Sequence, residues 1–202
     1  MKIGLDFDNT IVCYDEIFYR VALEEALIPN TAPQSKIFIR DYLRALERED
    51  EWTALQGRVY GSRMTEAKAF PGVKSFIASA VDGGHEVFII SHKTLHTIAG
   101  ERHNLHQAAR DWLADNEFEK MGLPNGNVYF ELTREQKIAR IKALSCDTFV
   151  DDLPEVLDEL GASHEIRRIL FDPNGIHSVG DKFERLSSWD QGTDFIFREK
   201  VR

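Results

Sequence analysis

The hydrophobic residues of this chain alternate between short continuous runs and longer stripes with helical spacing. Short runs are typical of strands buried inside a sheet, and stripes that repeat every three to four residues are typical of amphipathic helices. The predicted strands lie at residues 3–5, 86–90, 128–130, 148–150 and 168–171. This alternation predicts an α/β fold, a Rossmann-like parallel sheet with helices on both faces.

Two helices are predicted in the last quarter of the chain. Residues 153–160 read as a helix, and Gly161 follows at the position of a C-cap, where the backbone turns left-handed. Residues 183–189 read as a last short helix.

Residues 12–70 contain no strand of comparable quality. Three apolar stripes with helical spacing lie at 15–27, 35–46 and 51–64, and prolines separate the first two. We therefore expect an α/β core of residues 1–11 and 71–202, with a helical insert at 12–70 directly after the first strand.

Polar residues gather where the predicted strands end. Asp6 and Asp8 follow the first strand, Asp151 and Asp152 follow the fourth, and Ser91 follows the second. In an open parallel sheet these carboxyl ends form the ligand site. Carboxylates held close together repel each other unless a cation lies between them, and Mg²⁺ prefers such oxygen ligands. Taken alone, the Asp6–Asp8 spacing also fits an ordinary polar turn.

The four segments together resemble the motifs of the haloacid dehalogenase (HAD) superfamily of aspartate-nucleophile phosphatases. The first motif is matched by Asp6-Phe-Asp8-Asn-Thr10, and the second by Ser91. The third, a lysine upstream of the fourth, is best matched by Lys137, although Lys142 is a rival. The fourth is matched by Asp151-Asp152. Asn9 stands where glycine is commonest, and asparagine tolerates left-handed backbone better than most residues.

The resemblance implies a role for each acid. Asp6 would be the nucleophile that forms an aspartyl-phosphate, and Asp8 would protonate the leaving oxygen and later activate water. Mg²⁺ would be held by Asp6, by the main-chain carbonyl of Asp8 and by an acid of the fourth motif. We expect Asp152 to be the direct ligand, with Asp151 as its support or its alternative.

The remaining motif residues would bind the phosphate group or hold the turn after the first strand in position. By the same resemblance, Ser91 and Lys137 would donate hydrogen bonds to the phosphate oxygens, and Lys137 would also offset the acids. Thr10 would cap the turn after Asp8, with Asn9 in that turn. Without the paired acids, Ser91 and Lys137 would read as an ordinary strand-end hydroxyl and an ordinary surface lysine.

The insert resembles the small substrate-selecting cap of many members of this superfamily, although helices packed permanently on the core would show the same pattern. Its arginines read as surface residues rather than substrate clamps; they are Arg20, Arg40, Arg44, Arg58 and Arg63. His103 and His106 are three residues apart, which makes a zinc site conceivable, but loop or surface histidines fit better. His92 and Lys93 could instead line a substrate entrance.

Composition narrows the possibilities further. A length of 202 residues suits one α/β domain with a small accessory unit, and the formal net charge of −9 argues against a general nucleic-acid partner. The two cysteines, far apart in sequence, indicate a reducing compartment. We see no signal peptide and no membrane-length apolar run, so we expect a soluble cytoplasmic protein.

The leading hypothesis is therefore a Mg²⁺-dependent phosphomonoester hydrolase that acts on a small phosphorylated metabolite. Two alternatives stay open: a phosphotransferase or phosphomutase of the same superfamily, and a non-catalytic binding module with the same fold. Dehalogenation fits less well, because the resembling dehalogenases lack the acid that Asp8 supplies.

Overall fold

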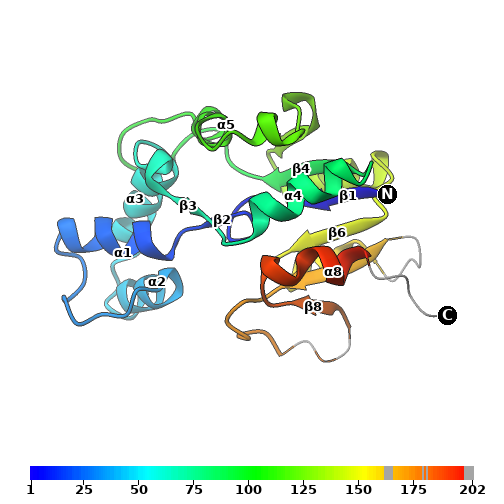
Figure 1. Ribbon diagram of the computed structural model, residues 1–202. Coiled ribbons are helices and arrows are strands. Elements are labelled where there is room, and N and C mark those ends of the chain that lie inside the picture. The colour runs from blue at the N-terminus through cyan, green and yellow to red at the C-terminus, as the bar shows by residue number, and fades with distance from the viewer. Residues whose placement is uncertain (162–165, 179, 181, 198–202) are drawn as a thin grey trace. The chain divides into compact units, whose positions relative to one another are not determined.

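A parallel sheet of six strands organises the larger part of the chain (Figure 1). The computed structural model describes residues 1–161, 166–178, 180 and 182–197. The strands, in chain order, are β1 Lys2–Leu5, β4 Glu86–His92, β5 Val128–Glu131, β6 Thr148–Asp151, β7 Arg167–Phe171 and β8 Glu184–Leu186. They lie in the order β5-β4-β1-β6-β7-β8, and every neighbouring pair is parallel. The predicted Rossmann-like parallel sheet is confirmed.

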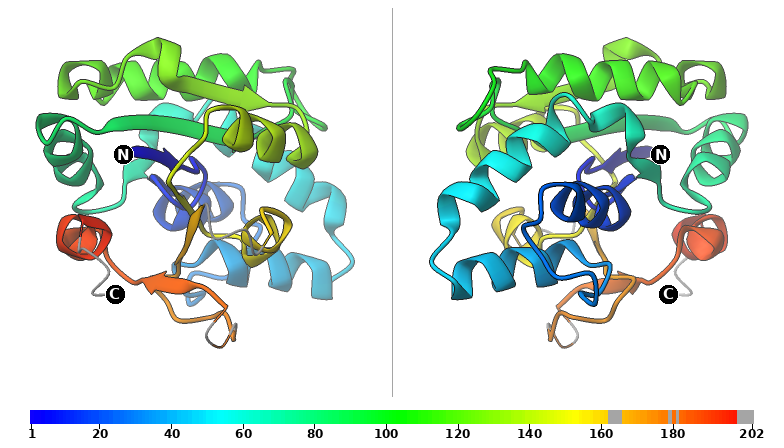
Figure 2. Two further views of the ribbon diagram at one scale, coloured as in Figure 1. Left: turned by 90° about the vertical axis from the view of Figure 1, so that its right-hand side faces the viewer. Right: turned by 90° about the vertical axis from the view of Figure 1, so that its left-hand side faces the viewer.

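Helices cover both faces of this sheet, as the sequence predicted. Figure 2 shows α4 Val73–Asp82 and α8 Gly192–Phe197 on one face, with α6 Arg134–Ala143 and α7 Pro154–Glu159 on the other. The central strands are apolar because they are covered on both faces; Ile3 and Leu5 of β1 are fully buried. Gly161, which follows the C-cap residue Leu160 of α7, has a φ of +82°, and this left-handed backbone confirms its predicted place at the end of that helix.

The predicted helix at 183–189 is wrong. Residues Glu184–Leu186 form the edge strand β8, which pairs with β7, and the short helix η4 Trp189–Gln191 and α8 follow it. Glu184 forms an ion pair with Arg167 of β7, and Leu186 is buried. A strand of three residues is too short to show the period that separates a strand from a helix.

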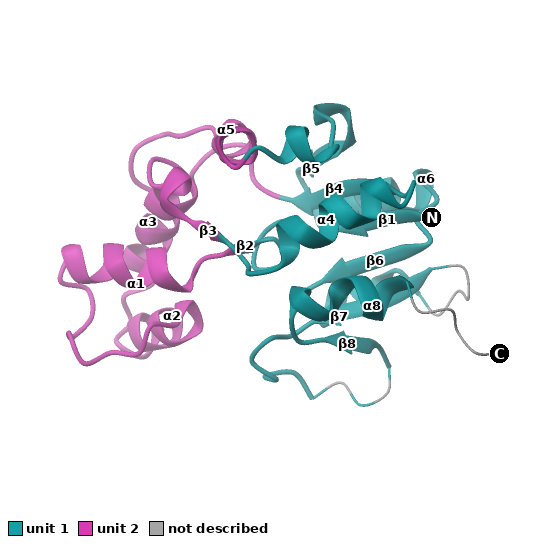
Figure 3. Ribbon diagram, viewed as in Figure 1, with its two compact units in different colours: residues 1–12, 69–92, 117–202 teal, residues 13–68, 93–116 magenta. Residues whose placement is uncertain are grey.

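The chain forms two compact units (Figure 3). The first contains residues 1–12, 69–92 and those from 117 onward, and therefore the whole sheet. It also holds the short helices η2 Phe118–Met121 and η3 Asn125–Asn127. The short strands β2 Val12–Cys13 and β3 Lys68–Ala69 pair with each other where the chain passes from one unit to the other.

The second unit is helical and contains residues 13–68 and 93–116. Its helices are α1 Asp15–Glu24, α2 Lys36–Ala45, α3 Glu49–Tyr60, η1 Met64–Glu66 and α5 Leu105–Asp115. The Ser35 side chain caps α2 and the Asn104 side chain caps α5, because each accepts a hydrogen bond from a main-chain N–H in the first turn. None of the helices in the described ranges is long and apolar enough to cross a membrane.

Residues 93–116, which the sequence analysis placed in the core, join the helical unit through close contacts. The Trp112 ring nitrogen of α5 donates to the Ala67 carbonyl at 2.8 Å. The loop before α5 approaches α3 at Gly57, where an added Cβ would lie 2.8 Å from the Ala99 carbonyl oxygen. Only glycine leaves room for that approach.

Candidate active site

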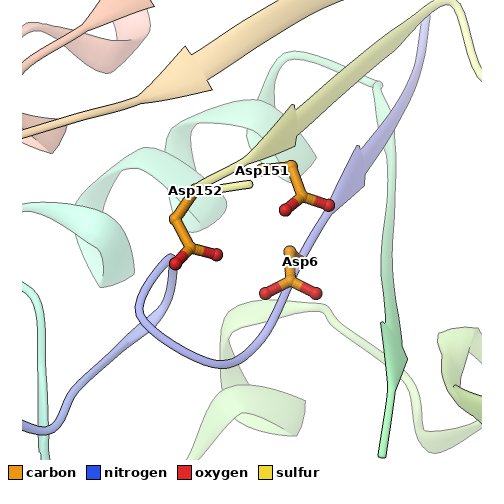
Figure 4. Close-up of side chains that lie close together, drawn as sticks. All are labelled: Asp6, Asp151 and Asp152. Carbon is orange, nitrogen blue, oxygen red and sulfur yellow. The ribbon is translucent and has the colours of Figure 1, made fainter. Parts of the chain in front are cut away.

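The carboxyl ends of β1 and β6 bring three acids together. Leu5 pairs with Val150, and the main-chain N–H of Asp6 donates to the Val150 carbonyl at 2.9 Å, so Asp6 and Asp151 follow at the same level of the sheet. Asp152 comes next. Figure 4 shows the three carboxylates turned toward one another, and each offers an oxygen that lies within 4.8 Å of the others.

Lys137 of α6 lies directly against two of these acids. Its Nζ is 2.6 Å from Asp6 Oδ1 and 2.6 Å from Asp151 Oδ2. The side chain is fully buried, whereas Lys142 on the same helix is exposed. The structure therefore brings Lys137, and not its rival, to the acids.

The electrostatics of this cluster follow from burial. Burial disfavours the charged form of Lys137, but the adjacent Asp151 and Asp6 outweigh burial, so the pKa of Lys137 is raised and its ammonium stays protonated. Burial raises the pKa of Asp151 to about 7, although Lys137 acts in the opposite direction. The Lys137 ammonium thus contacts two of the acids, Asp6 and Asp151, while Asp152 lies beside them.

That donor set fits a hard divalent cation. Asp6, Asp151 and Asp152 are the one group of side chains in the described part of the chain with metal-ligand spacing. Both oxygens of Asp151 already accept hydrogen bonds, one from Lys137 and one from the main-chain N–H of Leu153 at 3.0 Å. Asp152 is half-buried and therefore more open to an ion from solvent. Carboxylate oxygens at this spacing suit Mg²⁺ better than softer metals.

The turn after β1 carries Asp8, which is half-buried. Asn9 has a φ of 57°, which confirms the predicted left-handed backbone at this position. The predicted capping role of Thr10 finds no support. Its hydroxyl is buried and makes no hydrogen bond within the described residues, and the turn is closed by main-chain bonds to the Phe7 carbonyl instead.

A residue that sequence reasoning missed also fixes this turn. The ring nitrogen of Trp189 donates to the Thr10 carbonyl at 2.8 Å, across 179 positions of sequence. The Trp189 ring is buried and stacks on Phe171 with a centroid distance of 5.3 Å. No motif spacing signals such a contact; only the three-dimensional structure shows it.

Ser91 and His92 lie at the end of β4, the other neighbour of β1. Ser91 is buried, two residues beyond the Leu5–Ile89 pair, which places it at the same edge of the sheet as Asp6. Burial lowers the pKa of His92 and Lys137 lowers it further, while Asp6 and Asp8 partly oppose them. The His92 ring is therefore held neutral beside the acids.

The arginines of the helical unit are paired with acids, which confirms their interpretation as surface residues. The ion pairs are Arg20–Glu66, Arg40–Asp41, Arg44–Glu49, Arg58–Glu25, Arg63–Glu24 and Arg63–Glu66. The histidines of this unit form no metal cluster among the described residues. His106 instead makes a hydrogen bond to the Lys93 carbonyl, with 2.8 Å between the atoms.

Comparison with known proteins identifies the fold. No family model matches the chain. It is 24% identical over 196 residues to a protein of Oceanobacillus iheyensis named putative nucleotidase OB0422, and the match covers 94% of this chain and 95% of that protein.

Solved structures of HAD hydrolases resemble the whole chain. The putative HAD-hydrolase YfnB of Bacillus subtilis, bound to magnesium, has a TM-score of 0.63 at 13% identity and covers 98% of both chains. A predicted phosphoglycolate phosphatase of Haemophilus somnus has a TM-score of 0.60 at 13% identity, covering 96% of both chains. The resemblance read from the sequence is confirmed at the level of fold: the chain has the fold of HAD-superfamily hydrolases.

Proposed function

We propose that this protein is a phosphomonoester hydrolase that depends on Mg²⁺ and passes through an aspartyl-phosphate on Asp6. The observation that carries the proposal is the buried Lys137, whose ammonium bridges Asp6 and Asp151 at 2.6 Å to each. A buried lysine held by two acids beside a third is costly unless the charges serve a purpose.

Asp6 is suited to attack phosphorus. Lys137 holds the Asp6 carboxylate in one position by a hydrogen bond of 2.6 Å, and a carboxylate oxygen can act as a nucleophile. The reacting phosphate is anionic, so the site must offset its charge while it holds the attacking oxygen in line. When bound, Mg²⁺ supplies part of that charge, with Asp6, the Asp8 carbonyl and Asp152 as the proposed ligands.

Asp8 is proposed as the acid that protonates the leaving oxygen and then, as a base, activates water. It lies two residues from Asp6 in the left-handed turn, which Trp189 and the main-chain bonds to Phe7 hold in place. Ser91 is proposed to donate to a phosphate oxygen from the neighbouring strand. Asp151 is proposed to orient Lys137 rather than to bind metal directly, because both of its oxygens are already engaged.

We propose a small phosphorylated metabolite as substrate and the helical unit as the part that selects it, acting as a cap. A nucleoside monophosphate is the second candidate, because the similar protein of Oceanobacillus iheyensis is named a nucleotidase. Phosphoryl transfer to a hydroxyl other than water uses the same proposed residues, so product analysis has to separate it from hydrolysis.

Turnover of p-nitrophenyl phosphate tests the proposal. We expect release of nitrophenol and inorganic phosphate in equal amounts with Mg²⁺, and loss of turnover with EDTA or in Asp6→Asn. Transfer to added glycerol in place of phosphate release would identify a phosphotransferase. No turnover of the aryl phosphate, of sugar phosphates or of nucleoside monophosphates in the presence of Mg²⁺ would favour the non-catalytic module and reject the proposal.

A further inference from the structure

The two acids proposed for the chemistry, Asp6 and Asp8, are held by different elements of the unit that contains the sheet. The main-chain N–H of Asp6 donates to the Val150 carbonyl of β6 at 2.9 Å. The Asp6 carboxylate accepts from Lys137 of α6 at 2.6 Å. The proposed nucleophile is therefore fixed by β6 at its main chain and by α6 at its side chain.

The turn that carries Asp8 has main-chain anchors of its own. The Phe7 carbonyl accepts from the N–H groups of Ile11 and Val12, at 3.0 Å each, and so joins the two ends of the turn. The Ile11 carbonyl accepts in its turn from the main-chain N–H of Phe70 at 2.8 Å. These bonds hold the ends of the turn, and its middle is held by a side chain.

That side chain is Trp189 of η4. Its ring nitrogen donates to the carbonyl of Thr10, two residues after Asp8, at 2.8 Å. The Thr10 hydroxyl is buried and makes no hydrogen bond within the described residues, so the contact from Trp189 is made through the carbonyl alone. A buried carbonyl that loses its donor is costly, and the turn around it has to shift or open to find another.

Packing fixes the direction in which Trp189 points. Its ring is 2% exposed and lies against Phe171 and Phe76, with centroid distances of 5.3 and 4.9 Å. Gly72, directly before α4, lets the main chain of η4 come close, because an added Cβ would lie 2.6 Å from the Asp190 nitrogen. The indole N–H is thus presented to the turn from a fixed position.

We propose that Trp189 is a positioning residue for Asp8, which supports protonation of the leaving oxygen but not the attack by Asp6. This inference rests on the proposed function. In that step an Asp6 oxygen bonds to phosphorus, the ester P–O bond breaks, and the Asp8 proton passes to the leaving oxygen. The acids are two residues apart, yet β6 and α6 hold Asp6, whereas η4 holds the turn of Asp8. Loss of the indole N–H should therefore displace the acid and leave the nucleophile in place.

Two aryl phosphates of nearly the same shape distinguish these two roles. The nitrophenolate of p-nitrophenyl phosphate is a weak base that leaves without a proton, whereas the phenolate of phenyl phosphate is more basic and needs the acid. Trp189→Phe keeps an aromatic ring and removes the N–H. It should lower kcat/KM for phenyl phosphate about tenfold more than for p-nitrophenyl phosphate. Asp8→Asn should change the ratio of the two values in the same direction and by at least as much.

Trp112→Phe is the matched control. Trp112 is also a buried ring whose nitrogen donates to a main-chain carbonyl at 2.8 Å, that of Ala67, but it lies in the helical unit. Its ratio of the two kcat/KM values should equal that of the wild type. Should Trp189→Phe not fold, benzothienylalanine at position 189 keeps the bicyclic shape and replaces the N–H by sulfur, and the same ratio is measured.

Amide hydrogen exchange followed by NMR separates failure of this inference from failure of the proposed function, because it needs no turnover. In Trp189→Phe, the amides of Ile11 and Val12 should exchange about tenfold faster than in the wild type. The Asp6 amide, which donates to Val150, should keep its rate. That result in a wild-type protein that hydrolyses neither phosphate supports the separate anchoring of the two acids and rejects only the proposed function. Equal losses of kcat/KM on both substrates, or unchanged exchange at Ile11 and Val12, overturn the inference.

Discussion

Replacement of Lys137 by methionine removes the ammonium group that bridges Asp6 and Asp151 while it keeps most of the buried volume. Both carboxylates stay buried, at 4% exposure or less, and face each other without the ammonium that lies 2.6 Å from each. Removing one partner of a buried charge pair costs about 3–5 kcal/mol, because the remaining charge is poorly solvated. We expect Lys137→Met to lower the free energy of unfolding by that amount at neutral pH with EDTA present.

Two conditions should restore part of the free energy of unfolding that Lys137→Met loses. Lowering the pH allows Asp151 to take up a proton, because its pKa is already raised by burial and removal of Lys137 takes away an interaction that lowers it. A group whose pKa is raised in the folded state stabilises that state at low pH, and this contribution is lost as the pH rises. Mg²⁺ that binds the acids only in the folded state should also raise the free energy of unfolding, by about 2.7 kcal/mol at a concentration 100-fold above its Kd.

Urea unfolding followed by tryptophan fluorescence measures these effects. Lys142→Met is the control, since Lys142 lies on the same helix but is exposed, and its free energy of unfolding should stay within about 0.5 kcal/mol of the wild type. A Lys137→Met protein as stable as Lys142→Met at neutral pH in EDTA would show that Asp6 and Asp151 do not hold the buried charges assigned to them.

Three further predictions address the chemistry. Asp6→Asn should lower kcat on p-nitrophenyl phosphate by at least about 10³-fold with an unchanged circular dichroism spectrum, since an amide cannot attack phosphorus; near-normal turnover would disprove the covalent route. Asp152→Asn should raise the Mg²⁺ concentration for half-maximal activity more than Asp151→Asn does, because both Asp151 oxygens are already engaged; the reverse order would exchange the two roles. The pKa of His92 is lowered on folding, so the wild type should lose stability relative to His92→Asn as the pH falls through 6.5, where the unfolded chain takes up the proton first; parallel urea-denaturation curves across that range would contradict this.

The core sheet and its acids could be predicted because their signals are local. Five strands appear as apolar runs, and the paired acids follow two of them directly in sequence. The edge strand β8 could not be separated from a helix, because three residues show neither period. The left-handed turn at Asn9 could be predicted from the residue type, and its φ is 57°.

The features of the site that the sequence did not predict depend on contacts between segments that are distant along the chain. Lys137 and Lys142 are both plausible from their spacing, and only the direction in which each leaves the helix separates a buried lysine from an exposed one. The expected Thr10 cap failed because main-chain bonds to Phe7 close the turn. The Trp189 hydrogen bond joins residues 179 positions apart, and no local pattern contains that information.

The helical unit is built from two separate stretches of chain, and this restricts how such a unit can be exchanged between proteins. An insert made of one stretch can be cut out and replaced at a single pair of joints. Here a chimaera that exchanges only residues 13–68 would keep Trp112, a fully buried ring, after removing the Ala67 carbonyl to which it donates. The loop at Ala99 would also lose Gly57, the residue that lets it approach α3. Recombination, natural or designed, must therefore move residues 13–68 and 93–116 together. The second stretch begins at Lys93, directly after β4, the strand that carries Ser91.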